Sequence, residues 1–351
     1  MIYKYDETIK LFLDPKEYNK NSNKEILQFA VGGLLYSPAT NRKIAEDIIS
    51  RKRPDLHSIC LCLEDAIGDD MVEQAERSLK MTLSEIASAI NKNKISINDI
   101  PLIFVRVREP KQIKRLLSIC GKEAFSVLSG FSLPKFDKSN CIAYLDNFND
   151  VNSQMNDSLY IMPIIESKNV MYKQMRMEQL MFLNNQLLKV SDNVINVRVG
   201  ATDFCSTFGI RRSINNTIYD VRVISDCLAD IVNVFCKNYI ISGPVWEYFD
   251  SNGIPGPWSD GLIRELQMDK LNGFIGKTCI HPSQLKYIKE NNIVSYEQYK
   301  DALSILGMAD GITGVAKGFN NNKMNEVKTH TTWAKKIVGL SHIYGVAAPL
   351  S

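Results

Sequence analysis

Residues 159–167 read LYIMPIIES, and this short run indicates the architecture of the whole chain. Its first seven residues form a continuous stretch with no charged residue, and the run ends at Glu166. A continuous apolar run of this length is typical of a β-strand that is covered on both faces, as the strands of a parallel sheet are. The run therefore predicts a buried strand that ends in a carboxylate.

Similar apolar runs recur along the chain, and amphipathic stretches lie between them. After Asp69 and Asp70, for example, apolar residues follow helical spacing from Val72 to Ile90. Strands and helices that alternate in this way are typical of right-handed βαβ units and a parallel sheet. The predicted strands are 34–37, 58–63, 102–107, 126–133, 159–165, 194–199, 239–242 and 278–280, and further helices are predicted over 168–189, 218–236 and 260–271.

Eight such units predict an α/β protein with a TIM (β/α)8 barrel. A doubly wound open sheet is the alternative, but its nucleotide-binding fingerprint, G-x-G-x-x-G after the first strand, is missing. We expect the barrel domain to span residues 1–309, with 1–28 as an N-terminal arm. From residue 310 the sequence becomes Gly-rich and polar, and a last helix is predicted over 332–343. We expect residues 310–351 to be a C-terminal extension that packs beside the barrel mouth or on a neighbouring subunit.

Composition and charge exclude several classes of partner. The 351 residues are 45% hydrophobic, and 42 basic residues against 39 acidic ones give a net charge of +3. This balance, with no basic run, gives no electrostatic case for binding nucleic acid. No segment is apolar enough to suggest a signal peptide or a membrane span, so we expect a cytoplasmic protein without a membrane partner. The eight cysteines contain no C-x-x-C pair and are expected to be buried, reduced thiols.

Candidate site residues are found by asking which polar residues end the apolar runs, because a TIM barrel carries its active site at the carboxyl ends of its strands. Four runs end conspicuously, at Glu64-Asp65, Arg106, Glu166 and Asp203. Magnesium prefers oxygen ligands and usually takes one or two carboxylates from the protein. A nearby guanidinium can bind a substrate carboxylate with two parallel hydrogen bonds. The set therefore indicates a metal site with an anion-binding arginine.

Each of these residues also has a structural explanation. An acid at a strand end is often the N-cap of the next helix, which would account for Glu166, Asp203 or Asp65 taken alone. Arg106 could form a structural ion pair with Glu64 or Asp65. The functional interpretation is favoured because all of them fall at the same end of one barrel.

Eight motifs follow one another between about residue 33 and about residue 285. They are LLYSPATNRKIAEDI, ICLCLEDAIGD, IFVRVR, GFSLPKF, IMPIIES, VRVGATDF, SGPVWEYFDSNG and GFIGKTCIHPSQL. In this order they are similar to the motifs of the citrate lyase β-subunit family, which belongs with the HpcH/HpaI aldolases. Within this superfamily the chain most resembles a branch of barrel-fold C–C bond lyases found with tellurite-resistance-type gene clusters.

The resemblance implies a role for each strand-end residue. Glu166 and Asp203 match the two Mg²⁺ ligands of the family, and Mn²⁺ could replace Mg²⁺. Arg106 matches the catalytic arginine that binds a carboxylate or acyl oxygen of the substrate. Glu64 and Asp65 match the acidic pair that lies near the metal and its waters.

Three further residues are assigned more loosely. Arg42 falls near positions where relatives contact acidic or phosphate-bearing ligands. Arg211 is a candidate for binding an anionic substrate, or is simply a solvent-facing charge at a helix start. In the tail, Glu326 stands where relatives often carry an aspartate that reaches the active site of a neighbouring subunit, and this departure leaves its catalytic role open.

The predicted activity is a Mg²⁺-dependent retro-aldol or retro-Claisen cleavage, or the reverse condensation, through an enolate. The substrate is expected to be small and anionic: a 2-oxo acid, a hydroxy acid or an acyl carboxylate. The base could be Asp65, Glu326 or a metal-bound water. Two alternatives stay open, namely an enzyme of the malate-synthase or thioesterase type that uses a CoA thioester, and a non-catalytic accessory subunit. The resemblance also implies a homo-oligomer, a trimer or hexamer.

Overall fold

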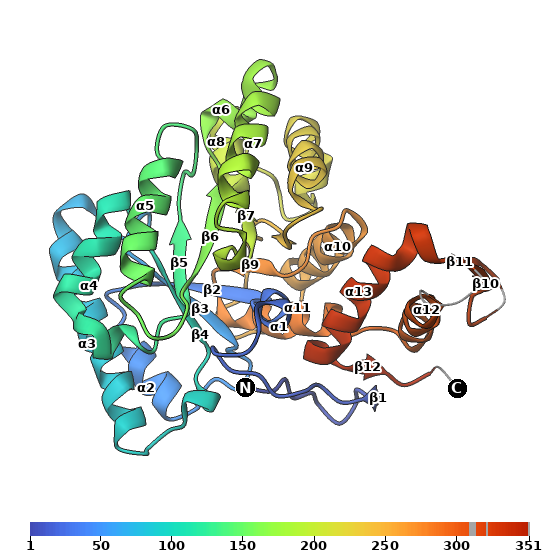
Figure 1. Ribbon diagram of the computed structural model, residues 1–351, viewed down its shortest axis with the longest axis horizontal. Helices are drawn as coiled ribbons and strands as arrows, with labels where there is room; N and C mark the ends of the chain where they lie inside the picture. Colours follow the sequence, from blue (N-terminus) through green and yellow to red (C-terminus); the bar gives the residue numbers. More distant parts are fainter. Residues whose placement is uncertain (309–313, 321, 350–351) are drawn as a thin grey trace. The chain divides into compact units, whose positions relative to one another are not determined.

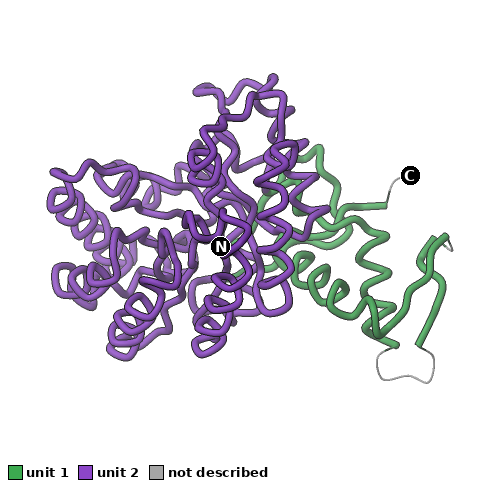
Figure 2. Tube along the Cα trace, turned by 90° about the horizontal axis from the view of Figure 1, so that it is seen from above, with its two compact units in different colours: residues 1–18, 289–351 green, residues 19–288 purple. Residues whose placement is uncertain are grey.

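The computed structural model describes residues 1–308, 314–320 and 322–349. The chain divides into two compact units (Figure 2). Asn19–Ile288 form the barrel unit, and Met1–Tyr18 with Lys289–Ser351 form the terminal unit. Part of the predicted arm and residues 289–309 of the predicted barrel domain thus group with the tail. The placement of the tail beside the barrel mouth or on a neighbouring subunit stays a prediction.

The barrel unit contains eight parallel strands, and each lies beside its neighbour in sequence (Figure 1). The order β8-β7-β6-β5-β4-β3-β2-β9 is closed by a parallel bridge between Gly243 and Lys277, where the Gly243 N–H donates to the Gly276 carbonyl at 3.0 Å. The sheet is therefore a closed TIM-type barrel, as predicted. Its strands are β2 (Gly33–Pro38), β3 (Ser58–Cys62), β4 (Leu102–Arg106), β5 (Gly130–Leu133), β6 (Tyr160–Ile165), β7 (Val197–Val199), β8 (Ile241–Ser242) and β9 (Lys277–Cys279).

Helices follow the strands and cover the outside of the barrel (Figure 1). Outward residues of the strands, such as Ile59 and Val105, belong to the same buried apolar cluster as Leu79 and Ile113 of the helices. The helices are α1 (Lys24–Ala30), α2 (Lys43–Ile49), α3 (Val72–Asn91), α4 (Pro110–Phe125), α5 (Cys141–Asn152), α6 (Lys168–Met171), α7 (Lys173–Leu188), α8 (Ala201–Thr207), α9 (Arg222–Phe235), α10 (Pro257–Leu271) and α11 (Leu285–Asn291), with 3-10 turns η1 (Asp69–Met71), η2 (Ile97–Asp99), η3 (Ser191–Asn193), η4 (Ile218–Asp220) and η5 (Pro282–Gln284). No helix among the described residues is both long and apolar enough to cross a membrane.

Alternation along the strands decides which side chains enter the barrel. In β2, β3 and β4 the register pairs Tyr36 with Cys60 and Cys60 with Phe104. Two residues further along, the same inward-facing row reaches Arg106, which β4 carries at its carboxyl end. The inward rows therefore lead directly to the residues that were predicted at the barrel mouth.

Several predicted elements differ from the structure: the strands predicted over 194–199 and 239–242 are shorter, and the helix predicted over 218–236 is divided into η4 and α9. The run 126–133 becomes a strand only at Gly130, whose φ is +154° and whose missing Cβ leaves room for the Tyr160 carbonyl. A residue with a side chain would clash there, so the glycine permits the close pairing of β5 with β6. The predicted helix 168–189 is interrupted at Tyr172, where ψ is 113°, and forms α6 and α7.

The terminal unit joins the first residues of the chain to the last. β1 (Leu11–Leu13) pairs with β12 (Val346–Ala347), and β10 (Val315–Lys317) pairs with β11 (Met324–Glu326). α12 (Tyr296–Gly307) packs on α13 (Val327–Tyr344), which is longer than the predicted helix 332–343. Of the predicted tail, residues 310–313, 321 and 350–351 lie outside the described residues.

Candidate active site

Arg106 lies at the centre of a cluster of acids. One of its terminal nitrogens, Nη2, lies 2.7 Å from Glu64, 2.9 Å from Asp65 and 3.1 Å from Glu166. The arginine and the two glutamates are buried, whereas the Asp65 side chain is half exposed. Three strand ends that are far apart in sequence thus meet in one ion-pair network. Arg106 therefore forms the ion pairs that the structural explanation predicts, at the strand ends where the functional explanation predicts a metal and substrate site.

Lys135 completes the cluster, and the sequence analysis missed it. Its backbone N–H donates to Glu166 Oε1 at 2.8 Å, and its ammonium group contacts Glu64 and lies 3.3 Å from Asp65. Its φ of +47° is uncommon for a residue with a side chain. Lys135 directly follows the apolar part of GFSLPKF, so the criterion that found the other strand ends would have found it too.

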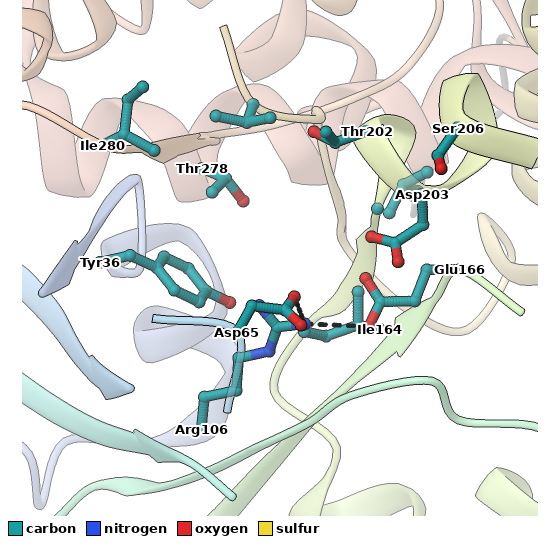
Figure 3. Close-up of a pocket in the computed structure, with 13 residues that line it drawn as sticks. Tyr36, Asp65, Arg106, Ile164, Glu166, Thr202, Asp203, Ser206, Thr278 and Ile280 are labelled. Atoms are coloured by element: carbon teal, nitrogen blue, oxygen red, sulfur yellow. Dashed lines mark hydrogen bonds and ion pairs between the residues drawn. The ribbon is translucent and has the colours of Figure 1, made fainter. Parts of the chain in front are cut away.

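A cavity of about 440 Å³ opens beside this cluster (Figure 3). Carboxylates from three strand ends border it: Asp65, Glu166 and Asp203. The lining is completed by Tyr36, Arg106, Ile164, Val199, Gly200, Thr202, Ser206, Val245, Thr278 and Ile280. The structure therefore places both predicted metal ligands and the predicted substrate-binding arginine around one space.

The electrostatics of the cavity favour a bound cation. Burial raises the pKa of Glu166 to about 8, and the charge of Asp203 adds to this, while Arg106 opposes it. The pKa of Asp203 is also raised, by burial and by the charge of Asp65. A carboxyl group with a raised pKa keeps its proton at a higher pH than usual, and a bound cation can replace that proton.

The donor set fits magnesium better than zinc. Among the described residues, no group of three or more His, Cys, Asp and Glu side chains is arranged to hold a metal ion by itself. Magnesium needs only one or two carboxylates, because water and substrate oxygens complete its octahedron. Glu166 and Asp203 supply that number, and Gly200 makes room for Glu166, since a Cβ at Gly200 would overlap the Glu166 carboxylate.

Two polar residues inside the barrel, Tyr36 and Thr278, also line the cavity and were not predicted from the sequence. Tyr36 Oη lies 3.2 Å from Ser132 Oγ, and burial raises the pKa of Tyr36, so its hydroxyl stays protonated. Thr278 Oγ1 accepts a hydrogen bond of 2.8 Å from Arg198 Nη2. Tyr36 and Thr278 lie within their strands and face the barrel interior, so a criterion based on the residues that end the strands does not find them.

Three of the loosely assigned residues do not line this cavity. Arg42 donates to the Ser78 carbonyl and the Thr82 hydroxyl, both at 3.0 Å, and lines a separate groove between α2 and α3. Arg211 is exposed. Glu326 belongs to the terminal unit, where its N–H donates to His330 Nδ1 at 3.0 Å. A substrate contact of Arg42 or Arg211 and a catalytic role of Glu326 stay predictions.

The raised pKa of Glu166 predicts how stability depends on pH. Between about pH 4.5 and pH 8 the native state keeps a proton on Glu166 that the unfolded state has lost, so the free energy of unfolding falls as pH rises. We expect the metal-free protein to lose at least about 1 kcal/mol between pH 5.5 and pH 8, since one pKa unit corresponds to about 1.4 kcal/mol. Urea unfolding at several pH values measures this.

Glu166→Gln is the control for this prediction. The lowered pKa values of His281 and His342 make the free energy of unfolding rise with pH, but they do so in wild type and variant alike. The difference in pH dependence between the two proteins therefore reports on Glu166. The same pH dependence in wild type and variant would contradict the assignment.

One protein family and several solved structures are similar to this chain. The family described as C–C bond lyase of the TIM-barrel fold matches residues 25–346. No curated protein sequence matches the chain. A citrate lyase from Burkholderia xenovorans has a similar structure, with a TM-score of 0.63 and 12% identity over 91% of this chain and 93% of that chain.

Two other solved structures are similar. CitE from Mycobacterium tuberculosis, in complex with magnesium, acetoacetate and coenzyme A, has a TM-score of 0.56 and 15% identity over 90% of this chain and 99% of that chain. A malate synthase from Haloferax volcanii has a TM-score of 0.55 and 12% identity over 80% of this chain and 77% of that chain. At these identities the structures show the shared fold. The family match covers nearly the whole chain, and the chain therefore belongs to the C–C bond lyases of the TIM-barrel fold.

Proposed function

We propose that this protein is a Mg²⁺-dependent lyase that cleaves a carbon–carbon bond in a 2-oxo acid, a hydroxy acid or an acyl carboxylate, or forms that bond in reverse. The observation that carries the proposal is the convergence of Glu166, Asp203 and Asp65 with Arg106 around one cavity at the carboxyl ends of the strands. Active sites of TIM barrels lie at this end.

Glu166 and Asp203 are the residues that would hold Mg²⁺. The bound ion would supply positive charge for the enolate that remains when the carbon–carbon bond breaks. The raised pKa values of both carboxyls and the room that Gly200 leaves beside Glu166 support this assignment. CitE, with its magnesium and acetoacetate, supports the same class of metal and substrate.

Arg106 and Lys135 would hold the acids in place. Arg106 keeps Asp65 and Glu166 at hydrogen-bonding distance, and the Lys135 N–H fixes one oxygen of Glu166. Arg106 lines the cavity, so its guanidinium would also be within reach of a substrate oxygen. These contacts fix the positions of the acids before a substrate arrives, which lowers the cost of ordering the site.

Asp65 is the carboxylate best placed to accept a proton from a substrate hydroxyl. It lines the cavity and is half exposed. Burial raises its pKa, but Arg106, Glu64 and Lys135 together bring the pKa below its ordinary value, so the carboxylate is ionised at neutral pH. A low pKa makes it a weak base. It would therefore need the enolate to be well stabilised by the surrounding charges.

A CoA thioester substrate, replacement of Mg²⁺ by Mn²⁺, a homo-oligomer and a cytoplasmic location stay predictions. For CoA, the support is CitE, whose structure contains coenzyme A. Arg42, which falls near positions where relatives contact acidic or phosphate-bearing ligands, lies in a separate groove.

Calorimetric titration with Mg²⁺ tests the proposal. We expect the wild type to bind Mg²⁺, and more tightly when pyruvate or oxaloacetate is present. Gly200→Ala should bind Mg²⁺ at least about tenfold more weakly, because the new Cβ would come within 2.5 Å of Glu166 Cβ and displace that side chain.

Gly68→Ala is the matched control, because its Cβ would meet no atom within 4 Å, and its Mg²⁺ affinity should not change. Release of a smaller oxo acid or acid from candidate substrates, only with Mg²⁺ present, would establish the lyase. A wild type that binds no Mg²⁺ with or without the oxo acids would refute the proposal.

A further inference from the structure

Arg198 is a buried cation without a buried anion beside it. It lies in β7 and is 1% exposed. The three other arginines that are buried in the described part of the chain each contact carboxylates: Arg106 contacts three, Arg176 lies 2.8 Å from both Asp226 and Asp230, and Arg212 contacts Glu265. Among the described residues, no carboxylate lies within ion-pairing distance of Arg198.

The contacts of Arg198 are neutral and incomplete. Nη2 donates to Thr278 Oγ1 at 2.8 Å, and Nη1 is 3.4 Å from Asn196 Oδ1, while Nε has no partner. Taking a charge out of water without a counter-ion destabilises a fold strongly. A charge that is kept under these conditions is expected to serve a ligand.

Thr278 connects this charge to the cavity. Its side chain lines the cavity although Arg198 itself does not. Because Thr278 Oγ1 accepts a hydrogen bond from Arg198, its own O–H is free to donate into the cavity. Figure 3 shows the Thr278 and Tyr36 hydroxyls on one side of the cavity and the Glu166 and Asp203 carboxylates on the other.

The two sides of the cavity differ in charge. The side of Glu166 carries four carboxylates, namely Glu64, Asp65, Glu166 and Asp203. Arg106 and Lys135 contact the first three of these acids, through ion pairs or the Lys135 N–H. An anion is repelled there unless a metal ion is bound. On the side of Thr278, hydroxyl donors stand in front of an uncompensated guanidinium. An anionic group is therefore attracted to the Thr278 side.

We propose that Thr278 and Tyr36, with Arg198 behind them, form a subsite for a second oxyanion of the substrate, so that the substrate is a dicarboxylate-class anion rather than a monocarboxylate. Arg198 is a positioning residue, because it donates a hydrogen bond to Thr278 Oγ1 and its positive charge attracts the anion. The assignment of the first oxyanion to the metal side rests on the proposed function. Anion binding at Thr278 does not need the metal.

The test measures anion binding to the full-length protein in EDTA, by calorimetry and by thermal unfolding, with malonate, acetate and inorganic phosphate at matched ionic strength. In EDTA we expect malonate and acetate each to bind through one carboxylate and to raise Tm; when Mg²⁺ replaces EDTA, we expect malonate to bind at least tenfold more tightly than acetate. Arg198→Met should weaken malonate binding at least tenfold, yet leave Tm without anion unchanged or higher. Arg198→Lys should restore part of the affinity.

The controls separate this subsite from a structural role. Arg77→Met removes an exposed arginine on α3 and should change neither affinity nor Tm. Thr278→Val, which has nearly the same shape, should weaken malonate binding at least threefold without lowering Tm, and it keeps the test valid if Arg198→Met does not fold.

Several outcomes would overturn the inference. Unchanged malonate affinity in both Arg198→Met and Thr278→Val would show that the subsite does not bind oxyanions. Tight binding of phosphate without binding of malonate would exclude the carboxylate class. Mg²⁺ titration separates the two proposals: malonate binding through Arg198 with no Mg²⁺ binding would refute the metal site alone, and the reverse result would refute the subsite alone.

Discussion

A Glu166→Gln/Asp203→Asn double variant is expected to show no heat of Mg²⁺ binding at concentrations that saturate the wild type. Both substitutions keep the shape of the side chain and replace an anionic oxygen donor by an amide. Magnesium binds weakly to sites without carboxylates, because it gives up its water reluctantly. Loss of both charges should lower the affinity more than about 1000-fold, which corresponds to about 4 kcal/mol.

The variant should remain folded, which makes this result interpretable. Glu166 and Asp203 have raised pKa values in the absence of metal, so their charges oppose the native state at neutral pH. We expect the metal-free double variant to be at least as stable as the wild type at pH 8, by urea unfolding.

A matched control is Glu73→Gln/Glu178→Gln, which also removes two negative charges. Both side chains are exposed, with 72% of their surface accessible, and neither lines the cavity. This control should bind Mg²⁺ as the wild type does. Normal Mg²⁺ binding by the Glu166/Asp203 variant would show that the ion is held elsewhere.

Glu265→Gln is expected to lower the free energy of unfolding by about 3–5 kcal/mol, the range for breaking a buried ion pair from one side. Glu265 is fully buried in α10. It contacts the Arg212 guanidinium, lies 2.8 Å from Lys277 Nζ and accepts from the Ile218 N–H at 2.7 Å. Losing its charge leaves Lys277 with Asp269 at 2.7 Å, and leaves buried Arg212 with only the more distant Glu247, at 3.6 Å.

A double-mutant comparison shows whether charge balance causes the effect. Glu265→Gln/Arg212→Met removes one anion and one cation, so Lys277 and Asp269 remain as a contacting pair at 2.7 Å. We expect the double variant to be more stable than Glu265→Gln alone. Guanidinium unfolding measures both, and Glu73→Gln, on the exposed face of α3, should change stability by less than about 0.5 kcal/mol. A double variant less stable than either single variant would contradict this account.

The Glu265 network also explains why a sequence interpretation of Arg211 and Arg212 is ambiguous. The two arginines are adjacent, and the pair suggested either an anion site or solvent-facing charges. In the structure Arg211 is exposed, while Arg212 is buried against Glu265 and its guanidinium lies 4.9 Å from the centre of the Trp246 ring. Neighbouring residues with the same chemistry thus have unrelated environments, which depend on the packing of α10 53 residues further along the chain.

Much of the barrel and part of its site could be predicted from local pattern. Strand formation follows from continuous apolar runs such as LYIMPIIES, because a segment buried on both faces must be apolar whatever its neighbours are. Glu64, Asp65, Arg106, Glu166 and Asp203 could be found because a residue that ends a parallel strand has its place fixed by the fold class. Lys135 obeys the same rule.

The tertiary structure alone decided the remaining contacts. Arg198 in β7 contacts Thr278 in β9, which is 80 residues further along the chain, because both side chains point into the barrel. Gly200 is required by Glu166, 34 residues before it in the sequence, and Arg42 turns toward α3 rather than the cavity. The sequence by itself determined the apolar strands and the charged residues at their ends, since these depend on local composition. Which side chains meet inside the barrel depends on strand register and closure, and these are set by the packing of the whole barrel.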